Sequence, residues 1–147
     1  MVVIPQLTFI YFFHLMGIIL MVGSVSVIDI FGFVARKSKQ WTYNTIEAHY
    51  ITKPLIWIGA SITTITWIVL LMKIPFTTPA LIKTMIIPLL LLNGSFLSFH
   101  ISPKLSKRRG KRSLLPQSLQ KKIGISFLIS IVLNWSFVFL TVLSLLS

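Results

Sequence analysis

The stretch that decides the fold class runs from Ile123 to Leu146 and reads IGISFLISIVLNWSFVFLTVLSLL. It carries no charged side chain along its whole length. A helix needs about 20 mainly apolar residues to cross the hydrocarbon core of a bilayer. Long apolar runs without two-residue alternation favour helices over strands. The stretch is therefore predicted to be a membrane-spanning helix.

Three earlier stretches have the same apolar character: Leu7 to Val34, Pro54 to Met72 and Pro79 to Ile101. The composition agrees, since 55% of the residues are hydrophobic and only 11% are charged, against about 25% charged in a soluble domain. The absence of Cys excludes disulfides and thiolate metal sites. The sequence predicts an all-α protein with one transmembrane domain over residues 1–147, an up-down four-helix bundle.

A short interfacial helix is predicted before the second span. Asn44 and Glu47 have the spacing of a capping box, which would open a helix from Thr45 to Thr52 near the membrane surface. Pro54 would then break or kink the chain where the span begins.

The third span carries its own boundary signals. Thr78 before Pro79 is typical of an N-cap followed by proline at the first helical position. Pro103 is expected to stop the helix, and Pro88 to kink it in mid-span.

The basic residues predict the orientation in the membrane. Four lie between the first two spans and eight lie in the loop 102–122, so twelve of the fourteen share one side (Arg36, Lys37, Lys39, Lys53, Lys104, Lys107, Arg108, Arg109, Lys111, Arg112, Lys121, Lys122). The positive-inside rule places them in the cytoplasm and both termini outside, in the cytoplasmic (inner) membrane. The loop is expected to attract anionic lipids. Nucleic acid is not an expected partner, because the loop lacks a folded scaffold and interleaved aromatic residues.

Ionisable residues within the outer half of the spans are the first candidates for a site. His14 is predicted to be a haem or metal ligand, a proton carrier, or a neutral imidazole bonded to a neighbouring helix. Lys83 lies at a similar depth. It would either extend to the membrane surface or face His14 and bind an anionic group.

A second group lies toward the cytoplasmic side and comprises Asp29, Glu47, His49 and His100. Two His and two carboxylates at one depth are suited to a divalent metal, and the two His alone to a haem iron. The alternatives are Glu47 as a helix cap, His49 as a wetted interfacial residue, and Asp29 paired with Arg36 or Lys37. His14 and His100 are expected to lie about 20 Å apart along the membrane normal, too far to share an iron.

Two amides are predicted near mid-membrane, Asn93 on the third helix and Asn134 on the fourth. Amides at that depth usually make hydrogen bonds between helices. Both are therefore assigned a structural role.

A resemblance accompanies these residues. His14-Leu-Met-Gly17, followed by Gly23, Asp29 and Gly32, resembles the first helix of a broad group of small four-helix prokaryotic membrane proteins. Lys83, Leu-Leu-Asn93 and Phe99-His100 are similar to their third helix. A weaker similarity leads to the CopD-like and HemJ-type proteins, the latter being protoporphyrinogen oxidases. It implies that His14 and Lys83 serve haem b or a porphyrin. The chain departs from the HemJ-type pattern at Val-Ser-Val-Ile-Asp29, where those proteins carry an aromatic, Pro-Arg-containing motif.

Three functions are consistent with these patterns. The first is a haem- or porphyrin-binding protein with a redox or haem-handling role, and the second is an accessory subunit of a larger membrane complex. The third is a small proton-linked carrier using Asp29 and the histidines, ranked last because few polar residues lie near mid-membrane. A homo-oligomer or larger complex is expected. No nucleophile triad or phosphate loop is present, and the sequence leaves open whether the protein is an enzyme.

Overall fold

The computed structural model describes residues 3–111 and 113–146, and every regular element within them is helical. The elements are α1 (Val3–Ala35), α2 (Lys39–Leu71), α3 (Thr78–Ser95), the π-helical segment η1 (Phe96–Ile101), α4 (Ser102–Ser106) and α5 (Gln117–Leu146). Arg112, one of the basic loop residues, lies outside the described residues.

Four helical stretches are long and apolar enough to cross a membrane: Gln6–Ala35, Lys39–Leu71, Thr78–Ser106 and Gln117–Leu143. The third of these is a continuous run through α3, η1 and α4. By length and composition, the chain is therefore a multi-pass membrane protein, and the predicted all-helical class with four spans is confirmed.

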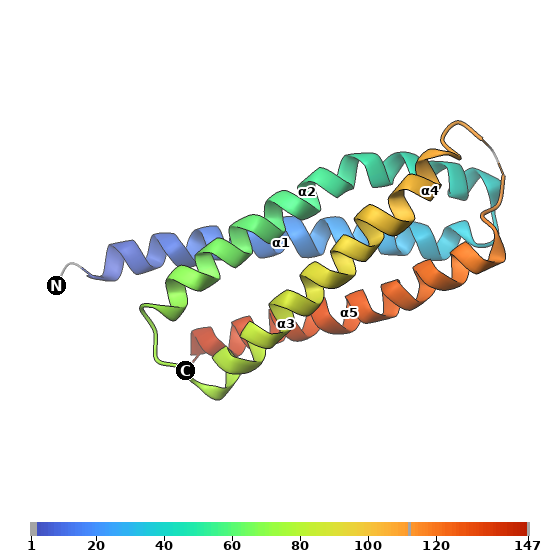
Figure 1. Ribbon diagram of the computed structural model, residues 1–147. Coiled ribbons are helices and arrows are strands. Elements are labelled where there is room, and N and C mark those ends of the chain that lie inside the picture. The colour runs from blue at the N-terminus through green and yellow to red at the C-terminus, as the bar shows by residue number, and fades with distance from the viewer. Residues whose placement is uncertain (1–2, 112, 147) are drawn as a thin grey trace.

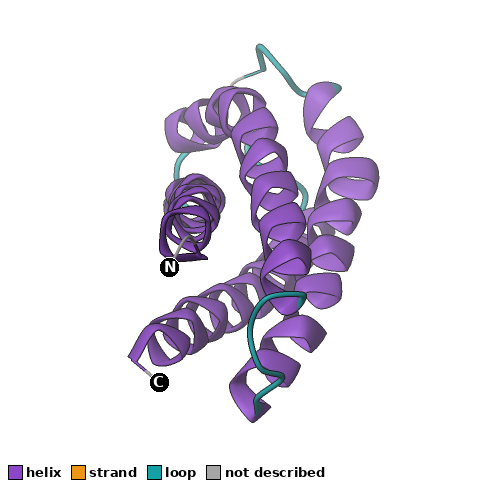
Figure 2. Ribbon diagram, turned by 90° about the vertical axis from the view of Figure 1, so that its left-hand side faces the viewer, coloured by secondary structure: helices purple, strands orange, loops and turns teal. Residues whose placement is uncertain are grey.

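The helices associate chiefly in two pairs, α1 with α2 and α3 with α5 (Figures 1 and 2). Both chain ends lie at one end of the bundle, and the connections 36–38 and 107–116 lie at the other (Figure 1). The approach of α1 to α2 depends on Gly17 and Gly59. A Cβ at Gly59 would lie 2.5 Å from the backbone nitrogen of Met21 and 2.7 Å from the carbonyl oxygen of Gly17. Only glycine permits this contact between backbones.

The predicted interfacial helix is not a separate element. α2 continues from Lys39 through Pro54 to Leu71, because a proline removes one N–H from the helix while tertiary packing holds the turns on either side of it. Ile46 and Thr52, which precede the proline, are both buried.

The predicted capping box is also wrong. Ser38 is the N-cap of α2, and its hydroxyl accepts a hydrogen bond from the backbone N–H of Trp41 at 3.4 Å. Asn44 lies inside the helix, where its side-chain oxygen accepts from Gln40.

The other boundaries differ by shorter distances. Thr77, one residue before the predicted cap, is the N-cap of α3, and Pro79 lies in its first turn. The third span passes Pro103 and ends at Ser106, since Pro103 falls in the first turn of α4, where a missing N–H is tolerated. α5 begins at Gln117 rather than Ile123, because the polar residues before Ile123 continue the helix beyond its apolar part.

Candidate functional site

His14 on α1 and Lys83 on α3 meet inside the bundle. The Nζ of Lys83 lies 2.9 Å from Nε2 of His14, and the two residues are only 1% and 0% exposed. The alternative in which Lys83 extends to the membrane surface is therefore wrong. The side chain turns inward because aromatic faces receive its amino group, 4.1 Å from the Trp67 ring centroid and 4.9 Å from that of Phe137.

The hydrogen bonds of this cluster assign the tautomer of His14. The hydroxyl of Thr66 donates its single hydrogen to the carbonyl of Ile62 at 2.6 Å. It must then accept from Nδ1–H of His14, which lies 2.8 Å away. Nε2 is left with its lone pair directed at Lys83, which donates. His14 is thus a neutral imidazole whose two ring nitrogens are both satisfied.

This arrangement does not fit a haem or porphyrin at His14. An iron ligand needs a free ring nitrogen, whereas both nitrogens of His14 are engaged and the side chain is fully buried. The two residues that the resemblance implies for haem or porphyrin binding lie side by side, and they are hydrogen-bonded to each other.

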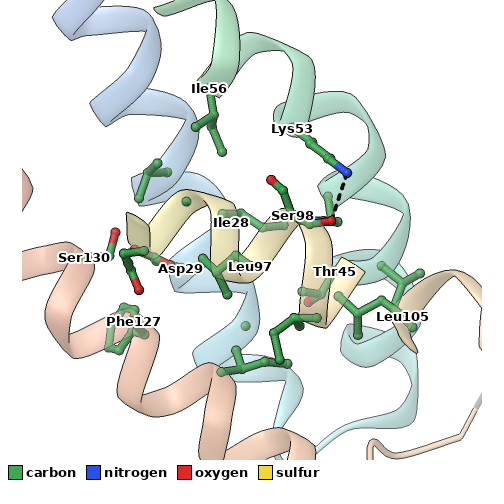
Figure 3. A pocket seen from close by; sticks show the side chains of 18 of the residues that line it. Ile28, Asp29, Thr45, Lys53, Ile56, Leu97, Ser98, Leu105, Phe127 and Ser130 are labelled. Atoms are coloured by element: carbon green, nitrogen blue, oxygen red, sulfur yellow. Dashed lines mark hydrogen bonds between the residues drawn. The ribbon is translucent and has the colours of Figure 1, made fainter. Parts of the chain in front are cut away.

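A cavity of about 130 Å³ lies in the half of the bundle nearer the connections 36–38 and 107–116, between the two helix pairs (Figure 3). All four candidate spans contribute to its wall. Most of the lining is apolar, with side chains such as Ile28, Leu97 and Phe127 facing inward (Figure 3). A mainly apolar wall with a few polar groups is typical of sites for small molecules. The volume is below the ~300 Å³ of the smaller drug-sized pockets, which suits a small ligand.

Asp29 is the acid in this wall, and it faces Ser130 of α5 (Figure 3). The predicted pairing of Asp29 with Arg36 or Lys37 is not made. Among the described residues, the ion pair found is that of Arg109 with Glu47, while the Arg36 guanidinium packs 5.3 Å from the Phe33 ring centroid. Asp29 is thus a carboxyl group without a cationic partner in the described part of the chain.

Two further polar atoms in the cavity lining are buried without a hydrogen-bond partner among the described residues: Nε2 of His49 and Oδ1 of Asn134. Asn134 is 4% exposed. Its amide nitrogen donates to the carbonyl and hydroxyl of Ser130, one turn earlier on the same helix, so the predicted bond between helices is not made. Buried polar atoms are usually satisfied. Oδ1 of Asn134 can accept a hydrogen bond from a ligand, and Nε2 of His49 can accept or donate one, depending on its tautomer.

The other amide, Asn93, has the role that the sequence predicts. Its amide nitrogen donates to the carbonyl of Ser126 at 3.2 Å, and the Ser126 hydroxyl donates to its oxygen at 2.7 Å. These bonds join α3 to α5 at the edge of the cavity.

The segment η1 forms part of the wall and was not predicted from the sequence. The hydroxyl of Ser98 in η1 accepts a hydrogen bond from the indole N–H of Trp57 at 2.9 Å. The backbone carbonyl of Ser98 accepts one from Nζ of Lys53 at 3.4 Å (Figure 3). Short π-helical segments inside α-helices are frequent at functional sites. No residue pattern in the third span distinguishes this turn from ordinary helix.

The four predicted metal ligands are not gathered together. Asp29 and His49 line the cavity, whereas His100 is exposed and stacks on Phe96 with ring centroids 5.3 Å apart. Glu47 is engaged elsewhere, by Arg109. Within the described residues, no three His, Asp or Glu side chains are placed to hold one metal ion.

The contact of Glu47 with Arg109 joins α2 to the loop that follows α4. Nε and Nη2 of Arg109 donate to the carboxylate at 2.9–3.2 Å, and the guanidinium lies 4.4 Å from the ring centroid of Tyr50. The hydrogen bonds and the charge of Glu47 raise the pKa of Arg109 above its ordinary value. Glu47 is therefore a docking point for the loop.

The described side chains thus form one buried, saturated cluster around His14 and one cavity with unpaired polar groups around Asp29. Comparison of the chain with protein-family models, curated proteins and solved structures finds no match. Of the two places, the cavity has both room and free hydrogen-bonding capacity for a ligand.

Proposed function

We propose that the chain is a carrier of the cytoplasmic membrane that moves a small, largely apolar molecule together with a proton. The observation that supports this is the position of Asp29. It is one of only two acidic residues in the sequence, it lines a cavity bordered by all four candidate spans, and it has no cationic partner in the described chain.

The chemistry of a carboxyl group in such a wall couples protonation to binding. Removing an ionised carboxylate from water without a cationic partner costs free energy, whereas the protonated acid is tolerated in an apolar wall. A ligand or water that enters the cavity changes the relative free energies of the ionised and protonated forms of Asp29. His49 and Asn134 add a ring nitrogen and a carbonyl oxygen for a polar group of the ligand, and the apolar side chains receive its body.

The proposal includes the orientation in which both termini lie outside and the cavity lies in the cytoplasmic half of the membrane. Because the sequence has no Cys, single cysteines report sidedness directly. In intact cells, a membrane-impermeant thiol reagent should label Thr77→Cys and leave Ser113→Cys unlabelled until the membrane is opened. The reverse pattern would invert the topology.

The proton-holding role of Asp29 is tested by dicyclohexylcarbodiimide, an apolar carbodiimide that adds to protonated carboxyl groups. We expect the purified protein in lipid nanodiscs to gain one adduct, located at Asp29 by peptide mass spectrometry, with less labelling as the pH is raised. Asp29→Asn should lose the adduct and Glu47→Gln should keep it. Absence of an adduct at Asp29 at every pH would refute a proton-holding carboxyl in the cavity.

Access of water to the cavity is tested by cysteine substitutions at two matched glycine positions. A Cβ at Gly94, in the cavity lining, or at Gly23, on the surface of α1, would meet no atom within 4 Å, so a cysteine fits at either position. In inverted membrane vesicles, a charged thiol reagent should react with Gly94→Cys and not with Gly23→Cys, which faces lipid. Equal protection of both would contradict a cavity open to the cytoplasm.

The haem-binding and accessory-subunit hypotheses give different results with the same preparation. A Soret band that is lost in His14→Ala would support the porphyrin role implied by the resemblance to CopD-like and HemJ-type proteins. A colourless protein that always purifies with a second protein in fixed ratio would support an accessory subunit. The carrier proposal expects a colourless protein that is complete by itself or as an oligomer of this chain.

A further inference from the structure

A second depression, of about 450 Å³, lies outside the central cavity and shares no residue with it. It is formed by the end of α4, the turn after it and the start of α5. Five of its eight lining residues are basic: Lys104, Lys107, Arg108, Lys111 and Lys122. The others are Pro116, Ser118 and the buried Leu119.

The positive charge of this depression is not neutralised by the chain. The sequence contains two acids, of which Asp29 lines the central cavity and Glu47 is engaged by Arg109. Neither lines the depression. The N-terminal end of the 30-residue helix α5 adds a further positive partial charge beside it. Five basic residues held together without a carboxylate favour a polyanion.

Large apolar side chains at this end of the bundle indicate where the anion comes from. Leu114, in the loop between Lys111 and Pro116, is 41% exposed, and Phe99, one turn before Lys104 along the chain, is 76% exposed. Exposed apolar groups beside a basic depression suit a ligand with a charged head and hydrocarbon chains. Basic pockets at the cytoplasmic ends of spanning helices bind the headgroups of anionic lipids.

We propose that this depression is a specific site for the headgroup of a phospholipid that carries two phosphate groups. The shared chemistry is that of two linked phosphate groups that together carry at least two negative charges, and the lipid is the source that the neighbouring apolar side chains favour. The site is independent of the central cavity, so it stands whether or not the protein is a carrier.

The test measures retention of diphosphatidylglycerol by the full chain in phosphatidylcholine nanodiscs, followed by native mass spectrometry. Lys107→Gln/Lys122→Gln removes two of the five basic residues. Lys37→Gln/Lys39→Gln removes the same charge from exposed residues near the same end of the bundle that do not line the depression. With a contribution of the usual size per basic residue, the first pair should weaken lipid binding by about thirtyfold.

We expect the unaltered protein to keep one such lipid per chain, the depression variant to lose it, and the control variant to keep it. Equal losses in both variants would overturn a specific site, because they indicate attraction by net charge alone. Displacement of the lipid by millimolar pyrophosphate would overturn the lipid as the source, and displacement by short RNA would favour a nucleic acid. A melting temperature equal to that of the parent in detergent confirms that each variant is folded.

Discussion

Replacement of His14 by alanine removes the hydrogen-bond partner of a buried lysine. The hydrogen bond alone would contribute about 0.6 kcal/mol, and at most about 1.7 kcal/mol, inside a membrane protein. His14→Ala also leaves the amino group of Lys83 without a hydrogen-bond acceptor within a 1% exposed site, and a buried donor left unsatisfied costs about 1–3 kcal/mol, or more if it is charged. The ring stacked on Trp67 at 5.8 Å is lost as well. We expect destabilisation of about 3 kcal/mol or more.

The measurement is the free energy of unfolding in mixed detergent micelles for His14→Ala, Lys83→Met and the double variant. Lys83→Met removes the amino group while keeping an apolar chain of similar length, so it should cost less than His14→Ala. The double variant should cost less than the sum, because the two residues interact directly. His49→Ala is the control. Its Nε2 has no hydrogen-bond partner among the described residues, so removal of the ring breaks no hydrogen bond of that atom.

The reasoning would be refuted by either of two results. If His14→Ala lost no more stability than His49→Ala, the buried pair would not hold the helices together. If the two single variants were strictly additive, His14 and Lys83 would not interact in the folded protein. Both results are independent of any bound ligand.

Gly59→Ala should destabilise the protein by roughly 1–3 kcal/mol, because the added Cβ would meet the backbone of α1. A Cβ at Gly94 would meet no atom within 4 Å, so Gly94→Ala should be neutral or stabilising. Both free energies of unfolding are measured in the same micelles. Asn93→Leu should cost about 0.6–1.7 kcal/mol by removing its bonds to Ser126, and no measurable loss would contradict its linking role. Glu47→Gln should leave the melting temperature nearly unchanged but speed tryptic cleavage within 107–111, because Arg109 loses its anchor. Equal cleavage rates would show that the loop is held by other contacts.

The class of the protein was readable from the sequence because membrane insertion depends on local composition. Each span must shield its own backbone polar groups in hydrocarbon, so length and hydropathy are sufficient to find it. The boundaries were less predictable. Pro54 was expected to break or kink the chain between a short interfacial helix and the second span, yet α2 continues through it as one helix, since the packing of neighbouring turns outweighs one lost hydrogen bond.

The sequence also identified the candidate residues, but it did not identify the partners of their side chains. His14, Lys83 and Asp29 were singled out because ionisable groups in hydrocarbon require a reason. Spacing along the chain placed Asp29 on the same helix face as Arg36, and no ion pair forms between them in the described structure. Partners on other helices depend on how each helix is rotated about its axis, which no local pattern specifies.

The sequence by itself determined that this chain has four segments long and apolar enough to cross a membrane, because length and hydropathy are properties of each segment separately. Only the tertiary structure decided that Lys83 bonds His14, that Glu47 holds Arg109, and that Asp29 lines a cavity. The physical reason is that helices in lipid gain little from hydrophobic burial against one another. Their packing follows from close backbone contacts such as Gly17 with Gly59 and from a few polar bonds, and these arise between residues far apart in the chain.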